Sequence, residues 1–150
     1  MFSKDKKMTH ALELRPILFA RHAQHVVLIH FPIALFLVGV LLDLVARLRH
    51  NVRLATAAQV NLAAAAILVV PAYLSGLLAW RFALEGQRIR GVLLYHLLLA
   101  SATTLLVIAT WWLRSRPRLH PNTLTLLELL GAVSIVLTAH LGGFLSGVNT

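Results

Sequence analysis

The chain has 150 residues, of which 59% are hydrophobic and only 13% are charged, and its mean hydropathy is +0.80. This composition is far more apolar than that of a soluble domain, and within these residues it leaves no room for a separate soluble module. The sequence has no cysteine, which excludes disulfides, thiolate metal ligation and a covalently attached c-type haem.

The formal net charge of +9 comes from fourteen basic residues against five acidic ones. In a soluble protein such an excess would suggest nucleic acid as a partner. Here the basic residues lie in the tail and in the segments between apolar runs, where they anchor helices and meet anionic lipid headgroups. We therefore expect lipid contacts and no nucleic-acid partner.

Four long apolar runs follow one another, at about residues 26–46, 54–80, 91–113 and 123–145. Each exceeds the ~20 residues that an α-helix needs to cross the hydrocarbon core of a membrane. The predicted fold class is all-α, an integral membrane four-helix bundle. A basic N-terminal tail, residues 1–24, precedes a single four-helix transmembrane domain, residues 25–150.

The first run enters the membrane through His30-Phe31-Pro32, which predicts that Pro32 stands in the first turn of its helix, where a missing N–H costs little. Near the end of this run Asp43 precedes Arg47 by four residues, a spacing that favours pairing. The second run is rich in alanine from residue 55 to 66, which favours close packing between membrane helices.

The third run ends at Trp111-Trp112, a pair typical of the membrane–water interface, and arginines follow it. The fourth run follows the segment 117–121 and ends with Gly142-Gly143. Glu128, about a turn into this run, is a candidate partner for a loop arginine.

Four histidines lie inside or at the rim of these runs: His25, His30, His96 and His140. Counting along an up-and-down bundle places His30, His96 and His140 at one membrane face and about 8 Å deep, with His25 at the rim. An ionisable residue in a membrane span is costly, and by default it indicates a functional site that faces other helices. Each of the three deep histidines has a small residue one turn away, which are Ala34, Ala100 and Gly143.

Several imidazoles at one depth are what a bundle needs to hold a haem or another metal centre. We expect one or two haem b groups, with His30 and His96 as the first choice of axial pair and His140 and His25 as substitutes or as a second pair. Arg21, Arg81 and Arg90 lie at the same face and are candidates to pair with the propionates. The alternatives are histidines that only join helices by hydrogen bonds, and a quinone or another metal in place of haem.

The segment His25–Leu35, with Asp43 after it, resembles the opening signature of a bacterial membrane family, the domain of unknown function 2231 (DUF2231). Weaker similarities are the segment 71–76, His96 and the segment 141–143. Val26 stands where the family's pattern has proline. The resemblance implies a four-helix membrane domain, sometimes joined to a Rieske-type iron–sulfur domain, which would suit electron transfer. No Rieske cysteines are present here, so the donor or acceptor would be another protein.

Two functional hypotheses follow. The first is a small b-type-cytochrome-like electron-transfer subunit of a larger respiratory or photosynthetic complex. The second is a cofactor-free accessory subunit that stabilises a membrane complex. An independent enzyme is disfavoured because no nucleophile–base pair or glycine-rich phosphate loop is visible. We expect a multi-pass protein of the bacterial inner membrane with both termini in the cytoplasm.

Overall fold

The computed structural model describes residues 21–82, 86, 88–116 and 120–146. These residues form four α-helices, and the prediction of an all-α fold is confirmed. The helices are α3 (Arg21–Arg49), α4 (Val52–Phe82), α5 (Val92–Arg114) and α6 (Pro121–Leu145). The tail residues 1–20 and the side chain of Arg21 lie outside the described part.

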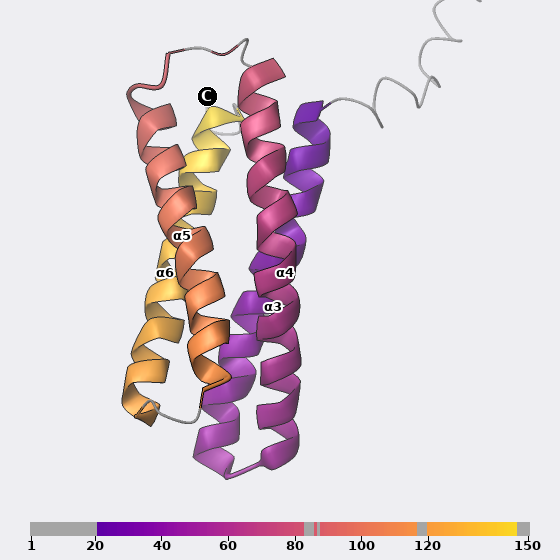
Figure 1. Ribbon diagram of the computed structural model, residues 1–150, viewed down its shortest axis with the longest axis vertical. Coiled ribbons are helices and arrows are strands. Elements are labelled where there is room, and N and C mark those ends of the chain that lie inside the picture. The colour runs from indigo at the N-terminus through magenta and orange to yellow at the C-terminus, as the bar shows by residue number, and fades with distance from the viewer. Residues whose placement is uncertain (1–20, 83–85, 87, 117–119, 147–150) are drawn as a thin grey trace, which may run out of the picture.

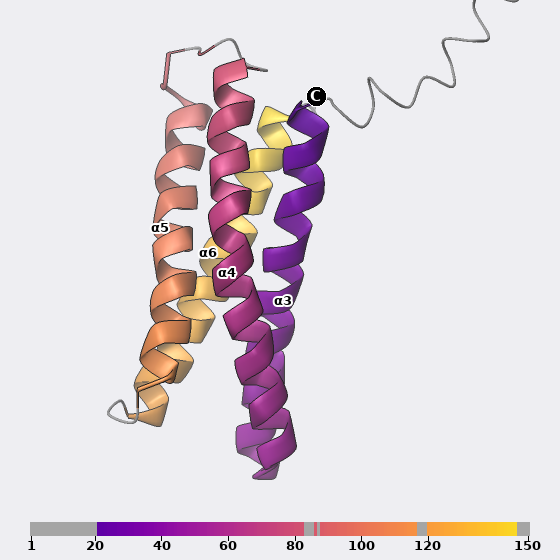
Figure 2. The ribbon, with the colours of Figure 1, turned by 45° about the vertical axis from the view of Figure 1, so that its right-hand side comes forward.

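The helices run up and down as two antiparallel hairpins, α3–α4 and α5–α6, which pack side by side (Figures 1 and 2). The starts of α3 and α5 and the ends of α4 and α6 therefore lie at the same end of the bundle. We name this the histidine end, because it holds His25, His30, His96 and His140. The opposite end is the charge end, which holds Asp43, Arg47, Arg114 and Glu128.

Local signals at the charge end set the bounds of three helices. After α3, His50 adopts a left-handed backbone conformation (φ 47°), and the Asn51 N–H donates to the carbonyl oxygen of Ala46 at 3.0 Å. The side-chain oxygen of Asn51 then accepts from the first backbone N–H groups of α4 at 3.0 and 3.2 Å, as an N-cap does. Pro121 occupies the first turn of α6, behind the capping residue His120. Only residues 50 and 51 connect α3 to α4, and this short connection makes the two helices antiparallel neighbours.

The prediction for Pro32 is wrong. α3 begins at Arg21, so Pro32 lies in the helix interior and not in the first turn. There its missing N–H deprives the carbonyl of Leu28 of its usual donor four residues on. The error arose because hydropathy marks where a helix enters hydrocarbon, whereas the helix itself begins earlier, in the polar residues that precede the apolar run.

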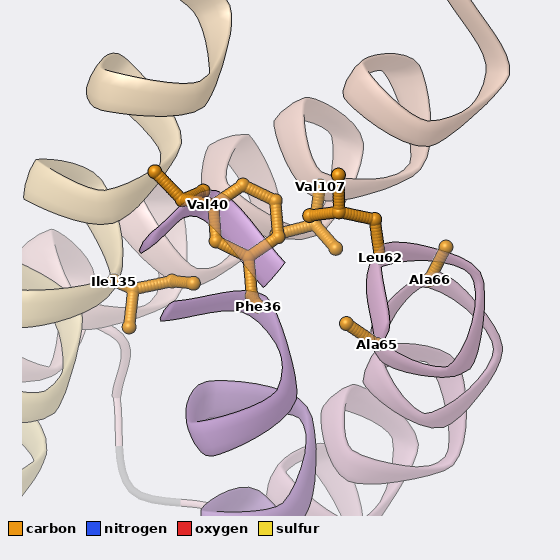
Figure 3. Packing of buried hydrophobic residues seen from close by; sticks show 7 residues of the cluster. All are labelled: Phe36, Val40, Leu62, Ala65, Ala66, Val107 and Ile135. Carbon is orange, nitrogen blue, oxygen red and sulfur yellow. The ribbon is translucent and has the colours of Figure 1, made fainter. Parts of the chain in front are cut away.

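The two hairpins meet in a core at mid-height, where Phe36 is fully buried. Figure 3 shows its ring between Ile135 of α6 on one side and Leu62 and Val107, of α4 and α5, on the other. A Cβ added to Gly131 would lie 2.6 Å from Cζ of Phe36, so only glycine lets α6 approach this ring. The core therefore joins all four helices.

The outer surface of the bundle is apolar. Exposed large hydrophobic residues occur on all four helices, and each helix is long and apolar enough to cross a membrane. Burial inside the bundle is correspondingly modest, since most apolar side chains face outward, where lipid would cover them. The chain is thus a multi-pass membrane protein, with four candidate spans among its described residues.

Candidate functional site

His96 is held in the groove between α5 and α6. It lies in the second turn of α5, is half-buried, and its Nδ1 lies 3.1 Å from the carbonyl oxygen of Thr138 on α6. A Cβ added to Gly142 would lie 3.2 Å from Cε1 of this ring, so the glycine makes room for the imidazole. The sequence placed His96 at this depth, but its contact with α6 depends on helix rotation.

The hydrogen bond fixes the tautomer of His96. A carbonyl oxygen only accepts, so Nδ1 carries the proton and, in the neutral ring, Nε2 carries the lone pair. Metal-bound histidines show this arrangement: one nitrogen donates to a carbonyl or hydroxyl oxygen, which orients the ring and leaves the other nitrogen to coordinate.

His25 repeats this arrangement in the other hairpin. Its Nδ1 lies 2.8 Å from Oγ of Ser75 on α4. The Ser75 hydroxyl already donates to the carbonyl oxygen of Ala72 at 2.7 Å, so Nδ1 of His25 is the donor in their bond. A Cβ added to Gly76 would lie 2.9 Å from Cε1 of the ring. Each hairpin thus has one anchored, Nδ1-protonated imidazole packed against a glycine.

His30 and His140 point out of the bundle. Both are exposed, and Nδ1 of His30 bonds to the carbonyl oxygen of Val26 on its own helix. The His140 ring packs edge-on against Phe144, with ring centroids 5.0 Å apart. The four histidines therefore share one end of the bundle but divide into two that face neighbouring helices and two that face outward.

The candidate arginines also lie at the histidine end. Arg81 and Arg90 are exposed, and the guanidinium of Arg81 lies 5.9 Å from the ring centroid of Phe82. The side chain of Arg21 lies outside the described residues. Within the described ranges, no three histidine or carboxylate side chains come together as a metal-binding group.

A row of hydroxyl groups continues below His96 in the α5–α6 interface. Oγ1 of Thr103 lies 2.9 Å from Oγ1 of Thr138 and 2.5 Å from Oγ of Ser134. Thr138 in turn donates to the backbone of its own helix at Ser134. The carbonyl that anchors His96 thus belongs to a residue that hydrogen bonds hold in place from two sides.

The charge end contains a buried ionic cluster. Arg47 pairs with Asp43 through Nε, and Arg114 bridges Asp43 and Glu128, with 3.1 Å between Nη1 and Oε1 of Glu128. Nη2 of Arg47 lies 3.8 Å from Oε2 of Glu128, a buried oxygen with no hydrogen-bond partner among the described residues. Asp43 and Glu128 are 2% and 0% exposed. The cluster joins α3, α5 and α6.

Sequence reasoning predicted the Asp43–Arg47 pair and a loop arginine as partner of Glu128, but neither the identity of that arginine nor the cluster. The Asp43–Arg47 pair is confirmed, and Glu128 does pair with an arginine at a helix end, Arg114. That Arg114 also reaches Asp43 was missed. The available signal was depth, since Asp43, Arg114 and Glu128 each lie within about two turns of a helix end at the same membrane face. Charges buried at a membrane boundary are stable only in such pairs, because a single one would face lipid.

A family model described as "Predicted membrane protein (DUF2231)" matches residues 21–148, which include all four helices. No curated protein and no solved structure matches the chain.

Proposed function

The chain belongs to the family of predicted membrane proteins DUF2231, and we propose that it is a small b-type-cytochrome-like electron-transfer subunit. In this proposal haem b is held at the histidine end, as one group or two. The chain would work within a larger respiratory or photosynthetic complex, and its electron donor or acceptor would be another protein subunit.

The observation that supports this proposal is the repeated anchoring of His25 and His96. Each ring donates through Nδ1 to an oxygen on the partner helix of its own hairpin. Each ring also packs against a glycine, Gly76 or Gly142. An oriented, Nδ1-protonated imidazole is the form in which histidine binds haem iron through Nε2. Two such rings, one from each hairpin, match the need for two axial ligands.

These contacts change the preferred ligand pair. The sequence favoured His30 with His96, but His30 is exposed and bonded to its own helix. We therefore assign the axial roles to His25 and His96. When bound, haem supplies one-electron transfer. The chain's own residues orient the imidazoles, surround them with apolar helices, and offer Arg81 and Arg90 to the propionates.

We further propose that the protein resides in the bacterial inner membrane with both termini in the cytoplasm. The argument is the basic tail before the first span, since the flank richer in lysine and arginine tends to stay inside. The histidine end, from which α3 begins, would then face the cytoplasm, and so would the arginines proposed for the propionates.

The test is a dithionite-reduced minus oxidised visible spectrum of the detergent-purified protein, with a pyridine haemochrome assay. We expect a b-type α-band that is lost in His96→Leu and His25→Leu. The matched control, His50→Asn, changes an exposed histidine at the charge end to a residue that tolerates its left-handed backbone, and it keeps the band. A flat spectrum from folded protein supplied with haem during expression would overturn the proposal.

A second candidate function is that of a cofactor-free accessory subunit. The observation that favours it is the outward orientation of His30 and His140, because polar side chains at membrane depth usually contact another helix. If so, His30→Leu and His140→Leu would weaken co-purification with a membrane partner, whereas His96→Leu would not. The two candidates thus depend on different pairs of histidines.

A further inference from the structure

A hollow opens at the charge end, between the two hairpins. It has a volume of about 410 Å³ and is lined by residues of all four helices: Asp43, Arg47, Gln59, Arg114, Pro121 and Leu124. α5 ends at Arg114, at the level of Asp43, whereas α3 continues for another six residues to Arg49, or about 9 Å. The projecting tip of the α3–α4 hairpin therefore forms one wall of the hollow, and the ionic cluster forms its floor.

The arginines of this floor have donors to spare. Arg47 uses Nε for Asp43, Nη1 for the carbonyl oxygen of Pro121 at 2.8 Å, and Nη2 for Oε2 of Glu128 at 3.8 Å. Arg114 uses its two Nη atoms for Asp43 and Glu128. A guanidinium carries more N–H groups than these contacts consume. Both arginines line the hollow, and each keeps N–H donors beyond those that these contacts use.

The charge end is also electropositive. Its described residues include two carboxylates, Asp43 and Glu128, and five arginines, which are Arg47, Arg49, Arg53, Arg114 and Arg116. Both carboxylates are buried and already paired, so the excess of arginines gives the outer surface of this end a positive charge. Both the donors and the field therefore favour an anion.

The depth of the hollow matches that of lipid headgroups. α5 has 23 residues, so it spans about 34 Å and ends near the boundary of a hydrocarbon core of ~30 Å. Trp112, two residues before Arg114, is exposed and carries the guanidinium of Arg116 at 4.7 Å from its ring centroid, as expected in the interfacial belt. The tip of the hairpin also exposes apolar side chains, Leu48 at 82% and Val52 at 79%, next to these arginines.

From these observations we propose that the hollow binds the phosphate of an anionic phospholipid. The phosphate oxygens accept from Arg47 and Arg114, and the acyl chains run from there along the apolar outer surface of the bundle beside Leu124. A free phosphate ion has the same oxygens but makes no use of this apolar surround, which is why the lipid is the favoured source. The site is independent of the histidine end.

The experiment is native mass spectrometry of the delipidated, detergent-purified chain with added phosphatidylglycerol or phosphatidylcholine. We expect phosphatidylglycerol to bind about thirtyfold more tightly, the effect of two arginines near a lipid surface. Gln59→Glu places a carboxylate in the hollow without breaking an ion pair, and should reduce that binding about fivefold. Leu124→Glu does the same from α6, in case the first variant folds poorly. The control is Arg53→Gln, which alters net charge equally at an exposed position outside the hollow.

The proposal stands if the loss is confined to the two hollow variants and millimolar inorganic phosphate leaves phosphatidylglycerol bound. Equal binding of the two lipids, or equal losses in Gln59→Glu and Arg53→Gln, would overturn it. Displacement by inorganic phosphate would overturn the lipid assignment, because the hollow would then recognise phosphate alone.

Discussion

The two ends of the bundle are held together in different ways. At the charge end, ion pairs cross between the hairpins, because Arg114 of α5 reaches Asp43 of α3. At the histidine end, the Nδ1 hydrogen bonds of His25 and His96 each link two helices of the same hairpin. We therefore expect the charge end to fix how the two hairpins sit together and the histidine end to leave them freer to adjust.

The difference follows from the cost of burying each kind of group. A charge that loses its partner at a membrane boundary is left uncompensated, so removing one charge from the cluster destabilises the charges that remain. An imidazole that loses one hydrogen bond remains a neutral ring and can rotate. Strong fixation at one end and adaptable contacts at the other would suit a protein that must admit a ligand between its helices.

The largest effect is expected for Arg114→Gln. This change leaves Asp43 and Glu128 buried with only Arg47 to share, and breaking such a buried pair costs about 3–5 kcal/mol. The free energy of unfolding in bicelles, measured by steric trapping, gives the loss. Asp43→Asn added to Arg114→Gln should recover part of it, since one uncompensated charge is then removed.

Arg116→Gln is the matched control for that experiment. Arg116 lies two residues further along and is exposed over Trp112, so its removal should cost no more than about 1 kcal/mol. If the two arginine variants lose the same stability, the cluster does not fix the charge end and the comparison fails.

The next largest effect is expected when an alanine replaces a glycine in the core, compared with the same change at the histidine end. A methyl group at Gly131 would meet Phe36 at 2.6 Å in the closely packed core, and overpacking of this kind costs about 1–3 kcal/mol. Gly142→Ala meets the His96 ring at 3.2 Å, and this ring can shift, so a smaller loss is expected. Thermal unfolding in detergent compares the two variants. Rescue of Gly131→Ala by Phe36→Leu would identify the clash as the cause.

Much of the fold could be predicted because a membrane helix shows in the sequence as a long run of apolar residues. The runs of apolar residues located four spans, and the four-residue spacing of Asp43 and Arg47 predicted their pair. Depth was also predictable, since counting at a fixed rise per residue puts His30, His96 and His140 at one end, with His25 at its rim. Each of these predictions needs only one helix at a time, or the fact that successive helices run in opposite directions.

Rotation about the helix axis could not be predicted. A soluble helix shows which side faces the core through its polar side, but here the outer face is apolar as well. His30 and His96 therefore had equal standing in the sequence, although one faces outward and the other faces α6. The link from Arg114 to Asp43 was hidden for the same reason, because it depends on how two hairpins are rotated against each other.

A smaller effect is expected for Ser75→Ala at the histidine end. The Nδ1–H of half-buried His25 then loses its Ser75 acceptor, at a cost of about 1 kcal/mol. If the hairpins adjust freely at this end, the loss in unfolding free energy stays near that value, and haem, if bound, shows a shifted potential. A loss as large as that of Arg114→Gln would make the histidine end as rigid as the charge end.

The smallest effect is expected for Tyr73→Phe, which removes a contact that the comparison of the two ends must also account for. The Tyr73 hydroxyl lies 2.8 Å from Oγ of Ser101 and joins α4 to α5, so one hydrogen bond does cross between the hairpins in this half of the bundle. Ser101 already donates to the carbonyl oxygen of Leu97 at 2.8 Å, so Tyr73 is the donor and its loss leaves no donor unpaired.

Hydrogen bonds between membrane helices average about 0.6 kcal/mol, and we expect a loss of that size for Tyr73→Phe by steric trapping. Ser101→Ala should then cost a similar amount, and the double variant no more than either alone, because both remove the same bond. A loss above about 2 kcal/mol would exceed the largest such bond measured in membrane helices. It would mean that Tyr73 holds the hairpins as firmly as charge does, and that the two ends differ in chemistry but not in rigidity.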